Sequence, residues 1–143
     1  YLQKEYPVMR GAAEFCLAWL IPDKNDKLIT SPSTSPENYF ITPTGFKGST
    51  LYGGTADLAM IRELFLGIIA AQEVLKNDLD FSKNIKSALD KLHPYQLGKA
   101  GNLQEWYYDW QDVEPTQAPK SFIRLISGHT CDANANTRYC KCC

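Results

Sequence analysis

The sequence predicts an all-α protein with long loops. Hydrophobic residues recur at helical spacing in three stretches, at about residues 7–20, 53–76 and 80–92. Val and Ile do not alternate with polar residues over any useful length, so we expect no sizeable sheet, although residues 28–33 fit a short strand. The long segments between and after the helices, residues 22–54 and 93–120, are rich in Pro, Gly, Ser and aromatic residues. Such loops on a helical scaffold are where we expect a functional site.

Each helix has its own start or stop signal. Pro22 and a polar run end the first helix, and Pro94 stops the third. In the second, Thr55 is placed to cap the amino end, and Asp57 puts a negative charge in the first turn, where the helix dipole favours it. The first helix carries Val8, Ala12, Phe15, Leu17, Trp19 and Leu20 on a broad apolar face. Three such faces leave apolar surface uncovered, so we expect partner helices outside this chain, or self-association.

Composition excludes several classes of function. The chain has 143 residues, enough for one small domain, and a net charge of −1 with a pI of about 6.1. That charge provides no electrostatic footprint for nucleic acid or an anionic membrane. No apolar run is long enough to span a bilayer. The chain begins at Tyr1 without a signal peptide, so we expect it to be cut from a longer protein. Its compartment stays open, and the parent protein could be secreted or periplasmic.

Glu37 is the first candidate for chemistry. It stands in "TSPSTSPENYF", residues 30–40, directly after Pro36. Proline fixes its own φ and biases the preceding Ser35 toward extended backbone, so the approach to Glu37 is partly preset. A general acid benefits from such a fixed position, because it must reach the leaving group at hydrogen-bond distance. The alternative is an ordinary turn with a solvated carboxylate.

The second candidate is an aromatic segment, "PYQLGKAGNLQEWYYDW", residues 94–110. It places aromatic rings among amides and carboxylates, including Gln104, Glu105 and Trp106. Sugar sites are commonly built in this way, with flat rings against C–H patches and polar side chains on the hydroxyls. The alternative is an aromatic loop that packs onto the core.

Histidine and cysteine chemistry finds little support. His93 lies at a helix end, where a dipole interaction is the ordinary role, and neither it nor His129 lies near a nucleophile. Cys16 fits a buried, inert thiol in a helix. The other four cysteines crowd into the last thirteen residues without a flanking fold to orient them. We therefore expect no metal and no cofactor.

Several segments together resemble glycoside hydrolase family 95, the α-L-fucosidases that act on 1,2-linked fucose. They are "RGAAEFCLAWLI", "LITSPSTSPENYF", "GGTADLAMIRELF" and "PYQLGKAGNLQEW", followed by "DW". They occur in the family's order over about residues 7–112. The resemblance implies an arc of an (α/α)6 barrel, an inverting mechanism and a fucosylated oligosaccharide as substrate.

The resemblance also assigns roles to residues. It makes Glu37 the general acid and places Gln104, Glu105 and Trp106 in a loop that lines the sugar pocket. In the family, an asparagine pair upstream and an aspartate downstream activate the water, and neither segment is present here. We therefore expect a catalytic fragment that is inactive by itself. Two other readings remain: a carbohydrate-binding remnant without turnover, and a small helical interaction protein.

The tail departs from the family pattern. After "WYYDWQD" the family continues with His-Arg-His, Ser-His and Gly-Leu-Tyr-Pro-Gly, whereas this chain reads "VEPTQAPKSFIRLISGHT". Read one base forward, the codons allowed for "TQAPKSFIRLISGH" permit "HRHQSHLFGLYPG". We interpret residues 1–113 as a partial barrel segment and residues 114–143 as an out-of-frame or disordered tail. The alternative is a genuine divergent tail that forms disulfides outside the cell.

The frameshift makes a prediction about the gene. We expect the codons of residues 116–129 to spell the family segment when read one base forward. Sequencing the gene tests this directly. Codons that cannot encode that segment would rule the frameshift out.

Overall fold

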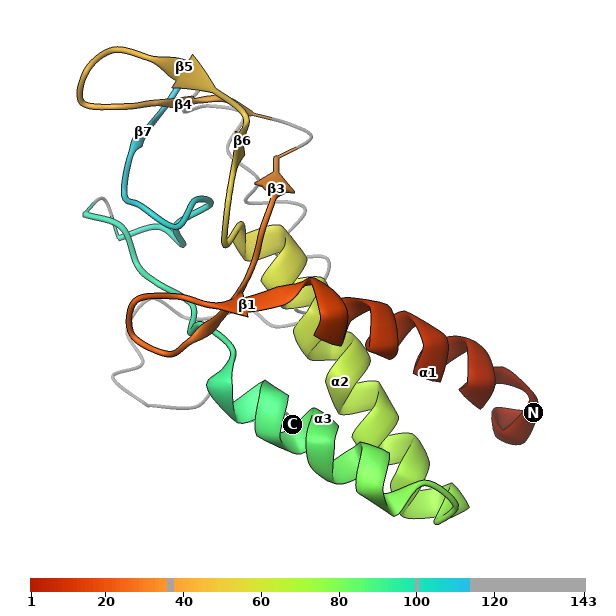
Figure 1. Ribbon diagram of the computed structural model, residues 1–143. Helices are drawn as coiled ribbons and strands as arrows, with labels where there is room; N and C mark the ends of the chain where they lie inside the picture. The colour runs from red at the N-terminus through yellow and green to blue at the C-terminus, as the bar shows by residue number, and fades with distance from the viewer. Residues whose placement is uncertain (36–37, 100, 114–143) are drawn as a thin grey trace.

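The computed structural model describes residues 1–35, 38–99 and 101–113. Three helices gather at one end of this part, and short strand pairs with the loop of residues 93–113 lie at the other (Figure 1). The helices are α1 (Leu2–Trp19), α2 (Thr55–Leu75) and α3 (Leu79–Lys91). The three predicted helices are confirmed; the barrel arc that they were expected to belong to stays a prediction.

The first helix differs from its prediction in two ways. It begins at Leu2 rather than Pro7, because the carbonyl of Tyr1 accepts the first backbone hydrogen bonds and the helix tolerates Pro7 in its second turn. The predicted apolar face is also only partly buried: Val8 and Phe15 are 71% and 66% exposed. Helical spacing marks one stripe, but the neighbouring helices cover only part of it.

The core forms around α2, which packs against both α1 and α3. Phe65 and Ile68 of α2 and Ile85 of α3 are fully buried there. Alanine at positions 13, 71 and 88 keeps the helices close. Among the described residues, this core cluster consists of Tyr6, Ala13, Leu20, Leu58, Ile61, Phe65, Ile68, Ala71, Ile85, Ala88 and Leu92.

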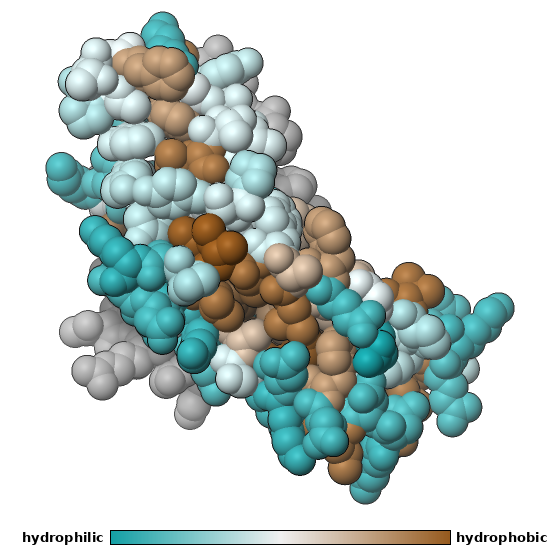
Figure 2. Space-filling model, viewed as in Figure 1, coloured by the Kyte–Doolittle hydropathy of each residue, from teal (hydrophilic) through white to brown (hydrophobic). Residues whose placement is uncertain are grey.

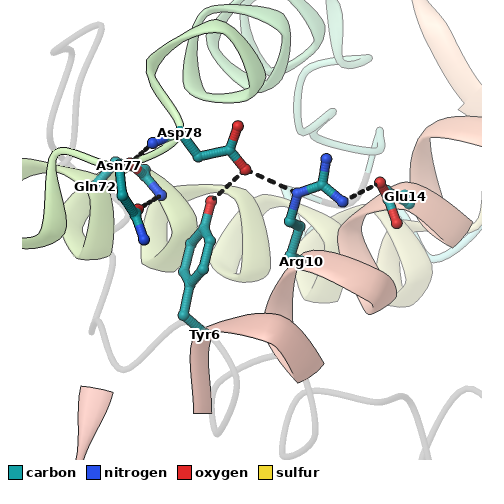
Figure 3. A network of polar contacts seen from close by, with 6 residues as sticks. All are labelled: Tyr6, Arg10, Glu14, Gln72, Asn77 and Asp78. Atoms are coloured by element: carbon teal, nitrogen blue, oxygen red, sulfur yellow. Dashed lines mark hydrogen bonds and ion pairs between the residues drawn. The ribbon is translucent and has the colours of Figure 1, made fainter. Parts of the chain in front are cut away.

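A polar network joins the three helices where α2 ends (Figure 3). The Asp78 carboxylate, just before α3, accepts hydrogen bonds from Tyr6 Oη at 3.3 Å and from Arg10 Nε at 2.8 Å, both on α1. The Asp78 backbone N–H donates to the Gln72 side chain at 3.0 Å. The turn between α2 and α3 is therefore fixed to α1 as well as to α2.

Short antiparallel strand pairs correct the all-α prediction in part, although no sizeable sheet was expected. Within the described residues no strand exceeds three residues, and a strand that short has no measurable alternation in the sequence. The predicted strand at residues 28–33 appears as β2 with its partner β1, and as β3. The strand pairs are β1 (Leu20–Pro22) with β2 (Leu28–Thr30), β3 (Ser33–Thr34) with β6 (Thr50–Leu51), and β4 (Phe40–Ile41) with both β5 (Lys47–Gly48) and β7 (Gln111–Asp112).

Hydrophobic residues also reach the surface of the helical end (Figure 2). Met60, Leu66 and Val74 of α2 are among the exposed ones. Within the described ranges, no helix combines the length and the apolar character needed to cross a bilayer. The expected tail of residues 114–143 lies outside the described residues. Cys16 was expected to be buried and is half-buried.

Two neighbouring residues on α2 test this packing. Phe65→Ala should lower the free energy of unfolding by about 3–5 kcal/mol, because a fully buried ring leaves a cavity. Leu66→Ala, at a position that is 45% exposed, should cost less than about 1 kcal/mol. Urea denaturation measures both, and equal costs would contradict the position of α2 in the core.

Candidate functional site

The structure describes the residues on both sides of the predicted acid. Glu37 and Pro36 lie outside the described residues, whereas Ser35 and Asn38 lie within them. Ser35 continues from β3, and its backbone N–H donates to the carbonyl of Ser49 at 3.2 Å. Asn38 is 3% exposed and leads into β4. The predicted acid is thus flanked on each side by residues that the fold holds.

Glu105 joins these two flanks. Its Oε1 accepts a short hydrogen bond from the hydroxyl of Ser35, and its Oε2 accepts one from the side-chain amide of Asn38 at 3.5 Å. The Asn38 backbone N–H also donates to Ser35 Oγ at 3.3 Å. Glu105 is 9% exposed, so this junction is buried. The two sequence-predicted segments, separated by about seventy residues, therefore meet in space.

The amino end of α2 holds the backbone of the second segment. Thr55 Oγ1 donates to the carbonyl of Gln104 at 2.6 Å, and the Thr55 backbone N–H donates to the carbonyl of Glu105 at 3.0 Å. Thr55 was predicted to cap α2 with its side chain. This prediction is wrong: Gly54 occupies the N-cap, and the Thr55 hydroxyl donates to the loop carbonyl of Gln104 instead.

Trp106 and Gln104 lie differently at this junction. Trp106 is 4% exposed, and its ring meets the buried Phe40 ring edge-on at 5.0 Å. Gln104 is half-buried, and its backbone N–H donates to the carbonyl of Gln96 at 2.9 Å. Glu105 thus contacts both flanks of position 37, and Trp106 contacts Phe40, two residues after Asn38. Gln104 precedes Glu105 in the chain and is the most accessible of the three.

Asp57 is a polar residue of this region whose role the sequence did not show. Its carboxylate accepts hydrogen bonds from Ser33 Oγ at 2.6 Å and Thr30 Oγ1 at 3.4 Å. Ser33 Oγ in turn accepts the backbone N–H of Gly54 at 3.1 Å. Burial raises the pKa of the Asp57 carboxyl, although the two hydroxyls act in the opposite direction. The sequence predicted that Asp57 lies in the first turn of α2, but its hydrogen-bond partners, Thr30 and Ser33, come from outside that helix.

A hollow of about 190 Å³ opens beside Asp57. Its walls are mainly apolar, and its residues come from the end of α1, from β3 and the residue before it, from β6 and from the first turn of α2. The lining residues are Trp19, Pro32, Ser33, Thr34, Thr50 and Asp57.

A second polar cluster fixes the other side of the aromatic segment. Tyr107 Oη donates to Asp23 Oδ2 at 2.8 Å, and the Tyr107 ring packs on His93 at 5.0 Å. His93 Nδ1 lies 3.5 Å from the same Asp23 oxygen. Burial and the Asp23 carboxylate raise the pKa of Tyr107 to about 12. His93 was expected at a helix dipole; instead it packs between the β1–β2 turn and the aromatic loop.

The described residues contain no group of three His, Cys, Asp or Glu side chains that could hold a metal ion. The expected cofactor-free chemistry stays a prediction.

Comparison with known proteins gives the family. The family model described as "Glycosyl hydrolase family 95 catalytic domain" matches residues 1–139. The chain belongs to this family. It is 40% identical over 131 residues to "Alpha-L-fucosidase 2" of Arabidopsis thaliana, and 33% identical over 115 residues to "Probable alpha-fucosidase A" of Aspergillus niger.

The family match covers far more of this chain than of its relatives. The alignments cover 90% and 76% of this chain, but 15% and 14% of the two fucosidases. The family 95 match continues past residue 113, where we expect the reading frame to change. The segments that carried the resemblance in the sequence all lie within the match.

Asp57 makes stability depend on pH. An unfolded Asp57 titrates near the ordinary value of 3.8, and the folded one above it. Between these values the native state binds more protons, so stability falls as the pH rises. Asp57→Asn removes this loss of stability. As the pH rises above 3.8, the unfolding free energy of the variant should therefore increase relative to that of the wild-type chain.

Urea denaturation from about pH 3 to about pH 7 measures this difference. Asp90→Asn, at an exposed position on α3, is the control and should show no such change. A constant difference for Asp57→Asn across the range would contradict the burial of its carboxylate.

Proposed function

We propose that this chain is a segment of an inverting α-L-fucosidase that removes terminal 1,2-linked fucose from oligosaccharides. Glu37 is its general acid and protonates the departing sugar oxygen. The observation that supports this most is the junction at Glu105, because it places the two flanks of position 37 against the segment of residues 104–106. Membership of family 95 and the names of two fucosidase relatives support the substrate class.

The neighbouring segment supplies the sugar side of the site. Gln104 is half-buried at the junction, so its amide can reach a substrate hydroxyl. Glu105 and Trp106 are buried and support the wall from beneath. A glycan is the one partner that this arrangement suggests; neither nucleic acid nor a membrane is part of the proposal.

Hydrolysis with inversion requires more than an acid. A second group must activate water on the opposite face of the sugar, with the two groups roughly 6.5–9.5 Å apart. Family 95 supplies this group from asparagine and aspartate segments that this chain does not match. We therefore propose that the isolated chain does not turn over fucosides.

Exchange of the segment into a complete family domain tests the acid. Residues 1–113 would replace the matching part of Alpha-L-fucosidase 2, and hydrolysis of aryl fucosides would be measured with Glu37 and with Glu37→Gln. Loss of a general acid should reduce kcat by about 10²–10⁴-fold for poor leaving groups. Fucosyl fluoride, whose leaving group needs no proton, should be hydrolysed at a largely unchanged rate.

Glu73→Gln, the same chemical change at an exposed position, is the control and should leave both substrates unaffected. Equal rates for Glu37 and Glu37→Gln on poor leaving groups would refute the assignment of the acid. Turnover by the isolated chain would refute its proposed dependence on other segments.

A further inference from the structure

The Glu105 carboxylate directs both oxygens toward one short segment. Oε1 meets the hydroxyl of Ser35, and Oε2 meets the amide of Asn38 at 3.5 Å. Ser35 and Asn38 are the residues directly before Pro36 and directly after Glu37 in the sequence. The Glu105 side chain therefore contacts both residues that flank Pro36 and Glu37 in the sequence.

The position of Glu105 is itself well supported. Its carbonyl accepts the Thr55 backbone N–H at 3.0 Å, and the preceding carbonyl of Gln104 accepts the Thr55 hydroxyl at 2.6 Å. Thr55 is the first residue of α2 and is 7% exposed. The carboxylate thus extends from backbone that is fixed to the end of the central helix.

Burial makes these contacts specific. A carboxylate that loses water must recover hydrogen bonds from the protein, and bonds to a charged acceptor are about twice as strong as neutral ones. At 9% exposure, Glu105 relies on the donors around it. If the segment of residues 35–38 moved away, the carboxylate would lose two of them.

We propose that Glu105 is a positioning residue that bridges Ser35 and Asn38 and so holds the two flanks of the proposed acid against the segment of residues 104–106. It acts through the loop and does not touch the substrate. Its consequence for catalysis rests on the function proposed above; the bridge itself does not. Glu105 thus differs from its neighbour Gln104, which contacts the sugar directly.

A double-mutant cycle tests the bridge in the 143-residue chain. Glu105→Gln presents an amide to the donor of Asn38, and Asn38→Asp presents a second carboxylate to Glu105. Combined, the two changes restore a donor and an acceptor in reversed order. The Asn38 Oδ1 contact to the Tyr39 backbone N–H at 2.8 Å survives in all variants, because Asp retains this oxygen.

Backbone amide hydrogen exchange at Asn38 and Tyr39 is the first readout. Each single change should accelerate exchange about tenfold, the effect of leaving a buried polar group without its partner. The double variant should return to within about threefold of the original rate, since paired changes at contacting residues are not additive. Amides of the buried α3 residues Ile85 and Ala88 serve as internal references, and Glu73→Gln is the control for loss of a carboxylate.

The outcomes separate clearly. The proposal would be overturned if these amides exchanged at the wild-type rate in Glu105→Gln. It would also be overturned if they exchanged no more slowly in the double variant than in the single variants. If a single change unfolds the chain, so that the α3 amides also exchange quickly, recovery in the double variant supports the bridge and failure to recover overturns it.

Kinetics in the segment-exchange fucosidase separate positioning from general support. Glu105→Gln should lower kcat about tenfold with KM nearly unchanged, and adding Asn38→Asp should restore it. A rise in KM alone would indicate sugar contact and overturn the positioning role. If instead Glu37→Gln has no effect in that protein, the proposed acid fails while the exchange result on the bridge stands.

Discussion

The amino end of α2 is the constraint on which the rest of the site depends. Thr55 donates to the carbonyls of Gln104 and Glu105, while Asp57, two residues further along α2, accepts the hydroxyl of Ser33. Two segments far apart in the sequence, at Ser33 and at residues 104–105, are therefore hydrogen-bonded to the same end of α2. Because α2 is also the centre of the core, the position of the candidate site is set by the helix that packs against both α1 and α3.

Stability and geometry have different sources in this fold. The helices bury aliphatic and aromatic side chains, and each such residue contributes about 1.5–3 kcal/mol. A hydrogen bond of the loop junction contributes only about 1 kcal/mol net, but an unpaired buried carboxylate costs considerably more. The junction therefore adds little to overall stability, while it strongly disfavours any loop arrangement that leaves Asp57 or Glu105 without donors.

Sequence reasoning identified the three helices and proposed two segments for the site, but it did not show that these two segments meet in space. Helical periodicity identified α2 and α3 because burial on one face repeats every turn. It failed at Val8 and Phe15, since periodicity marks a stripe without showing whether a neighbour covers it. Thr55 illustrates the other limit: its hydroxyl fits a cap locally, yet its partner lies in a loop 49 residues away. Strands of two or three residues leave no pattern to detect.

The segment of residues 104–107 is connected to the ends of two helices, and the two connections together orient it. One is the end of α2 at Thr55. The other is the end of α3, where the His93 backbone N–H donates to the Leu28 carbonyl at 3.0 Å and its ring packs on Tyr107, which binds Asp23. A loop fixed at one point can rotate about it, whereas two fixed points remove that freedom. A catalytic group must be held to within a fraction of an ångström, and that accuracy comes from rigid elements beneath it. Residues 104–107 include both connections, so the bridge from Glu105 to Ser35 and Asn38 extends from backbone that is fixed to two helices.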